Sequence, residues 1–260
     1  MNLPKTVFGV NTEKAYENYA AGAVKKASKP GAHQGLNVNA SINGQDYIRI
    51  PNTKILIAKQ ESYKGMKWEE THFALAENGL FMPTPALFMP YFLSIKDAAS
   101  GNLTLYDGNN NPIAKEEAED LWKYLTTNHR EGCWTWLDAK FESGNGHLEL
   151  DVLANHRVVD INGQKTLQGS RLPLEACVSK DCFVDLDFNK QGLARAKASK
   201  QSYEQGTNIY FWHPIDGCVA RFGACSGGAG LFCDGGPAGS SSGLGVFSCA
   251  EGTQKNKEQR

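Results

Sequence analysis

Long apolar runs are missing from this chain of 260 residues. No stretch reaches the length of about 18 apolar residues that a membrane-spanning helix needs. The N-terminal stretch MNLPKTVFGVNTEKAYENYA also lacks the basic segment and apolar segment of a secretion signal. Charge of one sign is scarce too: the net charge is −1, and no long block of like charges occurs. We therefore expect neither membrane insertion nor nucleic-acid binding, and the sequence alone assigns no cellular location.

Cysteines are few and irregularly spaced. The chain has seven of them, and their odd number and uneven spacing resemble neither a disulfide framework nor the paired C-x-x-C of a zinc site. We interpret them as buried free thiols, and we expect no metal and no cofactor.

With 41% hydrophobic residues, the chain is long enough to bury a core. We interpret residues 1–260 as a single domain in which residues 1–60 form an N-terminal extension whose packing stays open. That extension has a helical signal at Thr12–Ala21 and a strand-like stretch, YIRIPNTKILIA, at 47–58.

Two helices are expected in the middle of the chain. The first begins at Thr84, a capping residue followed by proline, and Pro90 should kink it. The second lies in AKEEAEDLWKYLTTN, where apolar residues recur at helical spacing behind an acidic N-terminal end.

Alternating segments after Gly132 predict strands, including a hairpin that turns at Asn162-Gly163. Further short strands are expected in CFVDLDFNKQGLA and NIYFWHPIDG, followed by an irregular, glycine-rich C-terminus. The expected fold class is α+β, with two helices packed on small antiparallel sheets.

Two groups of polar residues resemble metal ligands. Asp107, Asn109 and Asn111 match the start of a calcium loop, but proline and alanine replace the glycine and glutamate that the loop requires, so we interpret the stretch as a turn. His147, Glu149 and Asp151 would share one face of a strand, which we interpret as solvated rather than metal-binding.

Catalytic patterns are weak. Residues 239–243 satisfy G-x-S-x-G, but a hydrolase needs a helix after the serine, and no histidine follows that could act as base. A reactive pair, Cys225 and Cys233, stays open as a minority hypothesis.

The segment at 217–252 is unusual in composition. It holds more than a third of the glycines, yet Lys, Glu, Gln, Met and Trp are all absent from 217–248. Those five amino acids are the ones that no codon ending in a pyrimidine encodes. Randomising the adenines of asparagine codons would leave this bias, with small residues placed between fixed apolar ones.

This spacing resembles the variable region of archaeal diversity-generating retroelement proteins. The stretches NIYFWHPIDG, LFMPTPALFMPYF, EEAEDLWKYLT, GCWTWLDAKF and RLPLEA support the same resemblance. In that family, a reverse transcriptase copies a template repeat with errors at adenines, and the copy replaces the C-terminal region of a protein with a C-type lectin-like fold, which is related to that of formylglycine-generating enzyme. The resemblance implies a non-enzymatic ligand-binding protein whose variable region is 217–252.

The resemblance also divides the segment into two sets of positions. The scaffold set would be Val219, Ala220, Arg221, Phe222, Ala224, Ser226, Ala229, Leu231, Cys233, Pro237, Ser240, Leu244, Gly245 and Val246. The diversified, ligand-binding set would be Gly223, Cys225, Gly227, Gly228, Gly230, Phe232, Asp234, Gly235, Gly236, Ala238, Gly239, Ser241 and Gly243.

Most of the diversified set is small here, so Phe232 is the expected apolar anchor, Asp234 the expected charge, and weak binding the expected result. The ligand would be a protein or glycan, and a host or symbiont cell surface would suit a binder made to vary. Two alternatives stay open: a calcium-dependent carbohydrate-binding lectin using Asp216 and Asp234, and a formylglycine-generating-enzyme-like oxidase using Cys225 and Cys233.

Overall fold

The computed structural model describes residues 6–7, 10–11, 42–127, 132–144, 149–225 and 227–252. The chain divides into two units, residues 1–36 and residues 37–260. In the first unit, strands β1 (Thr6–Val7) and β2 (Val10–Asn11) pair antiparallel. The helix expected at Thr12–Ala21 lies outside the described residues.

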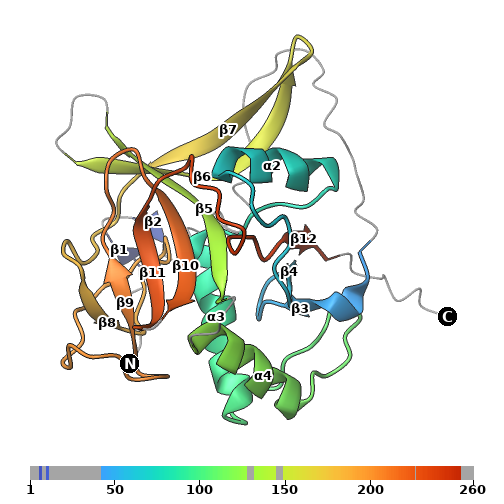
Figure 1. Cartoon of the computed structure of the whole chain (residues 1–260), viewed down its shortest axis with the longest axis vertical. Helices are drawn as coiled ribbons and strands as arrows, with labels where there is room; N and C mark the ends of the chain where they lie inside the picture. Colours follow the sequence, from blue (N-terminus) through green and yellow to red (C-terminus); the bar gives the residue numbers. More distant parts are fainter. Residues whose placement is uncertain are drawn as a thin grey trace. The chain divides into compact units, whose positions relative to one another are not determined.

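The second unit is α+β (Figure 1). Its described helices are the 3-10 helix η1 (Gly44–Asp46) and the α-helices α2 (Trp68–Glu77), α3 (Pro85–Ala99) and α4 (Lys115–Thr126). Among the described residues, none of these helices has the length and apolar character needed to cross a membrane.

A seven-stranded sheet is the centre of this unit, with strand order β7-β6-β5-β10-β11-β9-β8. Its strands are β5 (Trp134–Ser143), β6 (Leu150–Ile161), β7 (Gln164–Pro173), β8 (Cys182–Asp185), β9 (Asn208–Trp212), β10 (Val219–Cys225) and β11 (Gly228–Gly235). Strands β9 and β11 pair parallel and all other neighbours antiparallel, so the sheet is mixed.

A second sheet pairs strands from the beginning of this unit's sequence with a strand from near its end. It has the order β12-β4-β3 and consists of β3 (Tyr47–Arg49), β4 (Ile55–Ala58) and β12 (Cys249–Glu251). The strand-like stretch at 47–58 therefore forms strands, as predicted, and packs within the folded unit through pairing with the C-terminal end of 217–252.

Helix α3 begins where its sequence predicts. The Thr84 side chain accepts a hydrogen bond from the Leu87 amide, and Pro85 occupies the first turn, where its missing N–H costs nothing. Phe88 and Phe92 project from α3 onto Phe222 of β10, with ring centroids 5.0 and 5.1 Å apart. This contact buries one face of the large sheet.

Two predicted turns are confirmed. Asn162 and Gly163 have φ of 55° and 82°, the left-handed geometry that a two-residue hairpin turn between β6 and β7 requires. The Asp107 carboxylate accepts hydrogen bonds from the amides of Asn109 and Asn111, both at 2.8 Å, so this stretch is a turn stabilised by its own aspartate.

The picture of two helices on small antiparallel sheets is wrong in three respects. Helix α2 was not expected, because its buried face carries Thr71 and His72 beside Trp68 and Leu75, and these polar residues obscure the apolar period. The main sheet is large and mixed. The glycine-rich segment also contributes two of its central strands, with seven and eight residues, instead of brief strands and long loops.

Replacing Thr84 with alanine should lower the free energy of unfolding by about 1 kcal/mol, because the Leu87 amide loses its capping partner. Urea unfolding followed by circular dichroism would measure this change. Thr84→Ser, which keeps the hydroxyl, is the matched control and should unfold close to wild type. Equal losses for both variants would show that the cap does not stabilise α3.

Candidate functional site

The segment at 217–252 separates its two predicted sets of residues only in part on β10 and β11. Most scaffold residues face the core, but Arg221 lies on the other side with the diversified residues, several of which are themselves buried. Figure 1 shows these strands side by side between β5 and β9. Because side chains alternate along a strand, every second residue faces α3. The buried core accordingly contains Ala220, Phe222, Ala224, Ala229, Leu231 and Cys233, all of them predicted scaffold positions. We call the other side of these strands, with its neighbours Trp134 and Trp212, the outer face.

Aromatic rings form a continuous row across the outer face. Phe232 of β11 lies between Trp134 of β5, at a centroid distance of 5.0 Å, and Trp212 of β9, at 6.2 Å in a stacked arrangement. Tyr210 contacts Trp212 at 5.4 Å and extends the row toward β8. These rings come from three separate segments, and only the sheet order brings them together.

A charged pair lies against this row. The Arg221 guanidinium lies over the rings of Trp134 and Phe232, 5.4 and 5.6 Å from their centroids, in cation–π geometry. Its Nη2 is 3.8 Å from Oδ1 of Asp234, which is too long for a hydrogen bond. Arg221 Nε and Asp234 Oδ1 are both buried and lack a hydrogen-bond partner, which is uncommon for polar atoms in folded proteins.

The expected anchor, Phe232, is only 8% exposed because its neighbours cover it. Trp212, which the sequence did not single out, is 36% exposed. A ligand on the outer face would therefore meet Trp212 first, and Phe232 would support it from below.

Three predicted diversified glycines on the strands lie directly under aromatic rings. A Cβ atom at Gly223 would come within 2.6 Å of the Trp134 ring, and one at Gly230 within 2.9 Å of the Phe232 ring. At Gly228 it would come within 2.3 Å of Tyr203, and this glycine has φ of +98°. A larger residue at any of the three would require a ring to move.

The remaining diversified positions differ in exposure. Gly235 is buried at the end of β11, while Gly227, Gly236, Ala238, Gly239 and Ser241 are exposed and Gly243 is half-buried. The backbone of Cys225 ends β10. Among the scaffold positions, Val219, Leu244, Gly245 and Val246 are buried, Pro237 is half-buried, Ser240 is exposed, and Ser226 lies outside the described residues.

An exposed loop at 236–243, which we call the display loop, adjoins the outer face. A Cβ at Gly239 would contact the Trp136 ring at 3.9 Å, and Trp136 is the strand partner of Arg221. The Trp68 amide, at the start of α2, donates a hydrogen bond to the Pro237 carbonyl at 3.2 Å. The display loop is thus supported by β5 on one side and by α2 on the other.

The two alternatives receive little structural support. In the hairpin, Cys225 pairs with Gly228, whereas Phe232, the residue before Cys233, pairs with Arg221. Cys225 and Arg221 are four residues apart on β10, so the backbones of the two cysteines are separated along the strands by at least roughly 13 Å. Burial also raises the pKa of the Cys233 thiol well above its usual value. Asp216 accepts a hydrogen bond from the Ser143 amide, and neither Asp216 nor Asp234 belongs to a metal-ligand cluster among the described residues.

Of the predicted strand face with His147, Glu149 and Asp151, the structure describes only the last two residues. His147 lies outside the described residues, Glu149 is exposed, and Asp151 pairs with Arg171 at 3.1 Å.

A different cluster was missed: His72, Asp138 and His156 converge from three elements. Their positions are far apart in the sequence and share no spacing, so no local signal could have indicated them.

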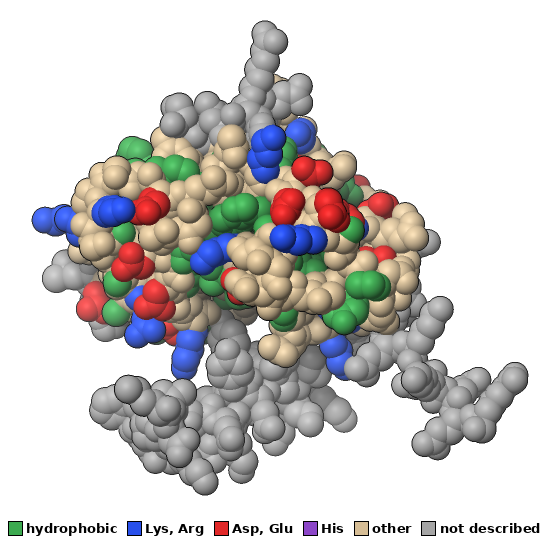
Figure 2. All heavy atoms as spheres, turned by 90° about the horizontal axis from the view of Figure 1, so that it is seen from below, with side chains coloured by type: hydrophobic (Ala, Val, Ile, Leu, Met, Phe, Trp, Pro, Cys, Tyr) green, Lys and Arg blue, Asp and Glu red, His purple; other side chains and the backbone are tan. Residues whose placement is uncertain are grey.

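The face shown in Figure 2 carries acidic and basic side chains close to one another, with hydrophobic side chains between them. Charges of both signs are thus interspersed on this face.

Comparison of this chain with protein-family models, with curated proteins and with solved structures found no match.

Gly228→Ala should lower the free energy of unfolding by more than about 1 kcal/mol, because the new methyl group meets Tyr203 in a backbone conformation that alanine disfavours. Gly236→Ala is the matched control: nothing lies within 4 Å of its Cβ position, and φ is not in the left-handed range. Chemical denaturation would compare the two variants. A Gly228→Ala protein as stable as Gly236→Ala would show that Tyr203 yields freely.

Leu231→Ala should cost about 2–5 kcal/mol of unfolding free energy, because Leu231 is fully buried in the core. Ser241→Ala, in the exposed display loop, should change it by no more than about 0.5 kcal/mol. Thermal and urea unfolding would test this contrast between scaffold and displayed positions. Similar losses at both positions would contradict the division.

Proposed function

We propose that this protein is a non-enzymatic ligand-binding protein with a C-type lectin-like fold, whose C-terminal region is diversified by an archaeal retroelement. The observation that carries the proposal is the separation by alternation along β10 and β11: Ala220, Phe222, Ala224, Ala229, Leu231 and Cys233 face the core, and predicted diversified residues lie on the other side beside the display loop. Phe222 and Leu231 are fully buried, whereas the display loop is largely exposed. A site that varies without unfolding the protein needs this separation.

The outer face has the chemistry of a recognition surface. It combines planar aromatic area at Trp212 and Trp134 with a cation at Arg221 and an anion at Asp234. Aromatic residues and arginine contribute most to binding energy in protein interfaces. The Arg221 and Asp234 side chains are 31% and 24% exposed, so their accessible polar atoms can form hydrogen bonds with a ligand. A protein or glycan is the ligand class that we propose, since both offer polar groups beside apolar area.

Binding by this variant should be weak. The exposed positions of the display loop are glycine, alanine and serine, which supply little contact area. Trp134 and Trp212, which lie outside the diversified set, would provide a basal aromatic surface, and larger residues in the display loop of other variants would add affinity and specificity. The region thus resembles antibody loops held on a rigid scaffold.

Sequencing the coding locus and its neighbourhood tests this proposal. We expect a reverse-transcriptase gene and a near-copy of codons 217–252 that differs from the gene only where the copy has adenines. Among copies of the gene from independent cells, substitutions should fall at the diversified set and spare the codons of Phe222 and Leu231. The codons of the β6–β7 hairpin, 150–173, serve as the internal control and should be constant.

Absence of any near-copy, or substitutions spread evenly over 150–252, would contradict diversification by a retroelement. A ligand-binding surface at Trp212 would then need a separate test, because its geometry does not depend on how the gene varies.

A further inference from the structure

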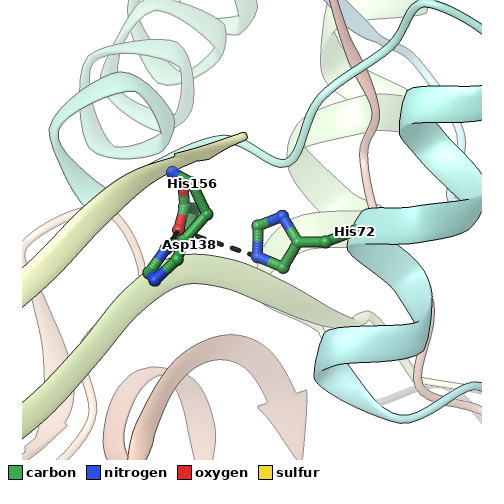
Figure 3. Close-up of side chains that lie close together, drawn as sticks. All are labelled: His72, Asp138 and His156. Atoms are coloured by element: carbon green, nitrogen blue, oxygen red, sulfur yellow. Dashed lines mark hydrogen bonds and ion pairs between the residues drawn. The ribbon is translucent and has the colours of Figure 1, made fainter. Parts of the chain in front are cut away.

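We propose that His72, Asp138 and His156 form a binding site for a divalent transition metal ion, with zinc as the best fit. The side chains come from α2, β5 and β6, and their ligand atoms all lie within 4.8 Å of one another. Figure 3 shows His72 pointing from the helix toward Asp138, with His156 beside the carboxylate. The site is separate from the outer face and does not depend on the proposed function.

The two distances from the Asp138 carboxylate to the histidines lie on either side of the ligand spacing in a tetrahedral zinc centre. His156 Nδ1 is 2.5 Å from Asp138 Oδ1, and His72 Nε2 is 3.7 Å from the same oxygen. Ligand atoms about 2.0–2.1 Å from a tetrahedral zinc ion are roughly 3.3 Å apart. Metal binding would therefore require His156 and Asp138 to separate by less than about 1 Å.

His72 carries the strongest sign of a missing partner. Its side chain is 3% exposed, and Nε2, the atom that faces Asp138, is buried without a hydrogen-bond partner. Buried polar atoms are nearly always hydrogen-bonded or bound to an ion.

Asp138 supplies the negative charge. It is 2% exposed, and its ion-pair partners among the described residues are the two histidines. One carboxylate oxygen accepts a hydrogen bond from the His156 amide at 2.8 Å, which fixes its orientation and leaves the other oxygen to face both rings. A buried carboxylate that lacks a lysine or arginine partner among the described residues favours a bound cation.

The surroundings determine which nitrogen of His156 takes part. The His156 ring lies against β7 at Gly169, where an added Cβ would be 2.4 Å from Nε2. Nε2 is therefore directed at the β7 backbone, and Nδ1 faces the cluster. The Trp68 indole meets both imidazoles edge-on, at 4.5 and 5.0 Å, and restricts their rotation.

Two imidazoles and one carboxylate identify the class of ion. Calcium and magnesium prefer oxygen ligands only, whereas zinc and its neighbours accept this mixed set. Three ligands from the described residues leave a coordination position for water, as in zinc sites that are not purely structural. The bound ion would cross-link α2 to β5 and β6, and α2 supports the display loop through the Trp68–Pro237 hydrogen bond.

Zinc titration of the full-length protein, after removal of metal with a chelator, tests the site. Calorimetry should show one zinc ion bound per chain and a higher Tm with zinc present. Cobalt should give the visible absorption of a four-coordinate centre with nitrogen and oxygen ligands. His72→Gln should weaken zinc binding at least about 10-fold to 100-fold, a loss comparable to or larger than that of an outer-shell partner.

Gly169→Ala is a second variant that removes no ligand. Its methyl group would push on His156, and it should weaken zinc binding about tenfold or more while the protein stays folded, because Gly169 is exposed. His213→Gln is the matched control. His213 pairs with Asp181 at 2.6 Å on the surface, and the variant should bind zinc as wild type does.

Several results would overturn the proposal: wild-type protein that binds neither zinc nor cobalt, or zinc binding that persists unchanged in both His72→Gln and Gly169→Ala. Loss of binding in His213→Gln, with His72→Gln unaffected, would place the metal at the surface pair instead. If His72→Gln does not fold, the Gly169→Ala affinity and the cobalt spectrum of wild type decide the question.

Discussion

The contact between Phe222 and the two phenylalanines of α3 fixes the register of the central hairpin, and much of the unit depends on it. Phe222 is fully buried, and its strand partner Leu231 lies in the same core. Because side chains alternate along a strand, moving either strand by one residue would place the outer-face residues in the core. The hairpin can therefore tolerate many small residues on its outer side while its position stays fixed.

Signals confined to a few neighbouring residues were read correctly from the sequence. Thr84-Pro85 marks the start of α3, and Asn162-Gly163 marks a hairpin turn, because the chemistry that produces each feature is local. Helix α2 was missed for the opposite reason. Its core face includes His72, which is buried through contacts with β5 and β6 that no helical period reveals.

The strands β10 and β11 show the limit of composition as a guide. Their glycine content suggests a linker, yet Gly223 and Gly230 are buried strand residues covered by Trp134 and Phe232. The space over Gly223 is filled by the Trp134 ring of the neighbouring strand β5, and the space over Gly230 by the Phe232 ring of the same strand. Trp134, Trp212 and Phe232 are far apart in the sequence, so the aromatic row follows from sheet order alone. The parallel pairing of β9 with β11 is similarly non-local.

The outer face and the adjoining display loop respond differently to a change of residue. On the strands, a new side chain at Gly223 or Gly230 has to displace a ring that already covers the backbone, so variation there reshapes the aromatic row. In the display loop, Gly236 has open space around it, so variation adds contacts without rearrangement. The display loop is in turn attached to α2 through Pro237, and α2 is where His72 faces Asp138. The display loop is therefore linked to the packing of α2 on β5 and β6, and a metal ion at that junction would restrain the helix that supports the loop.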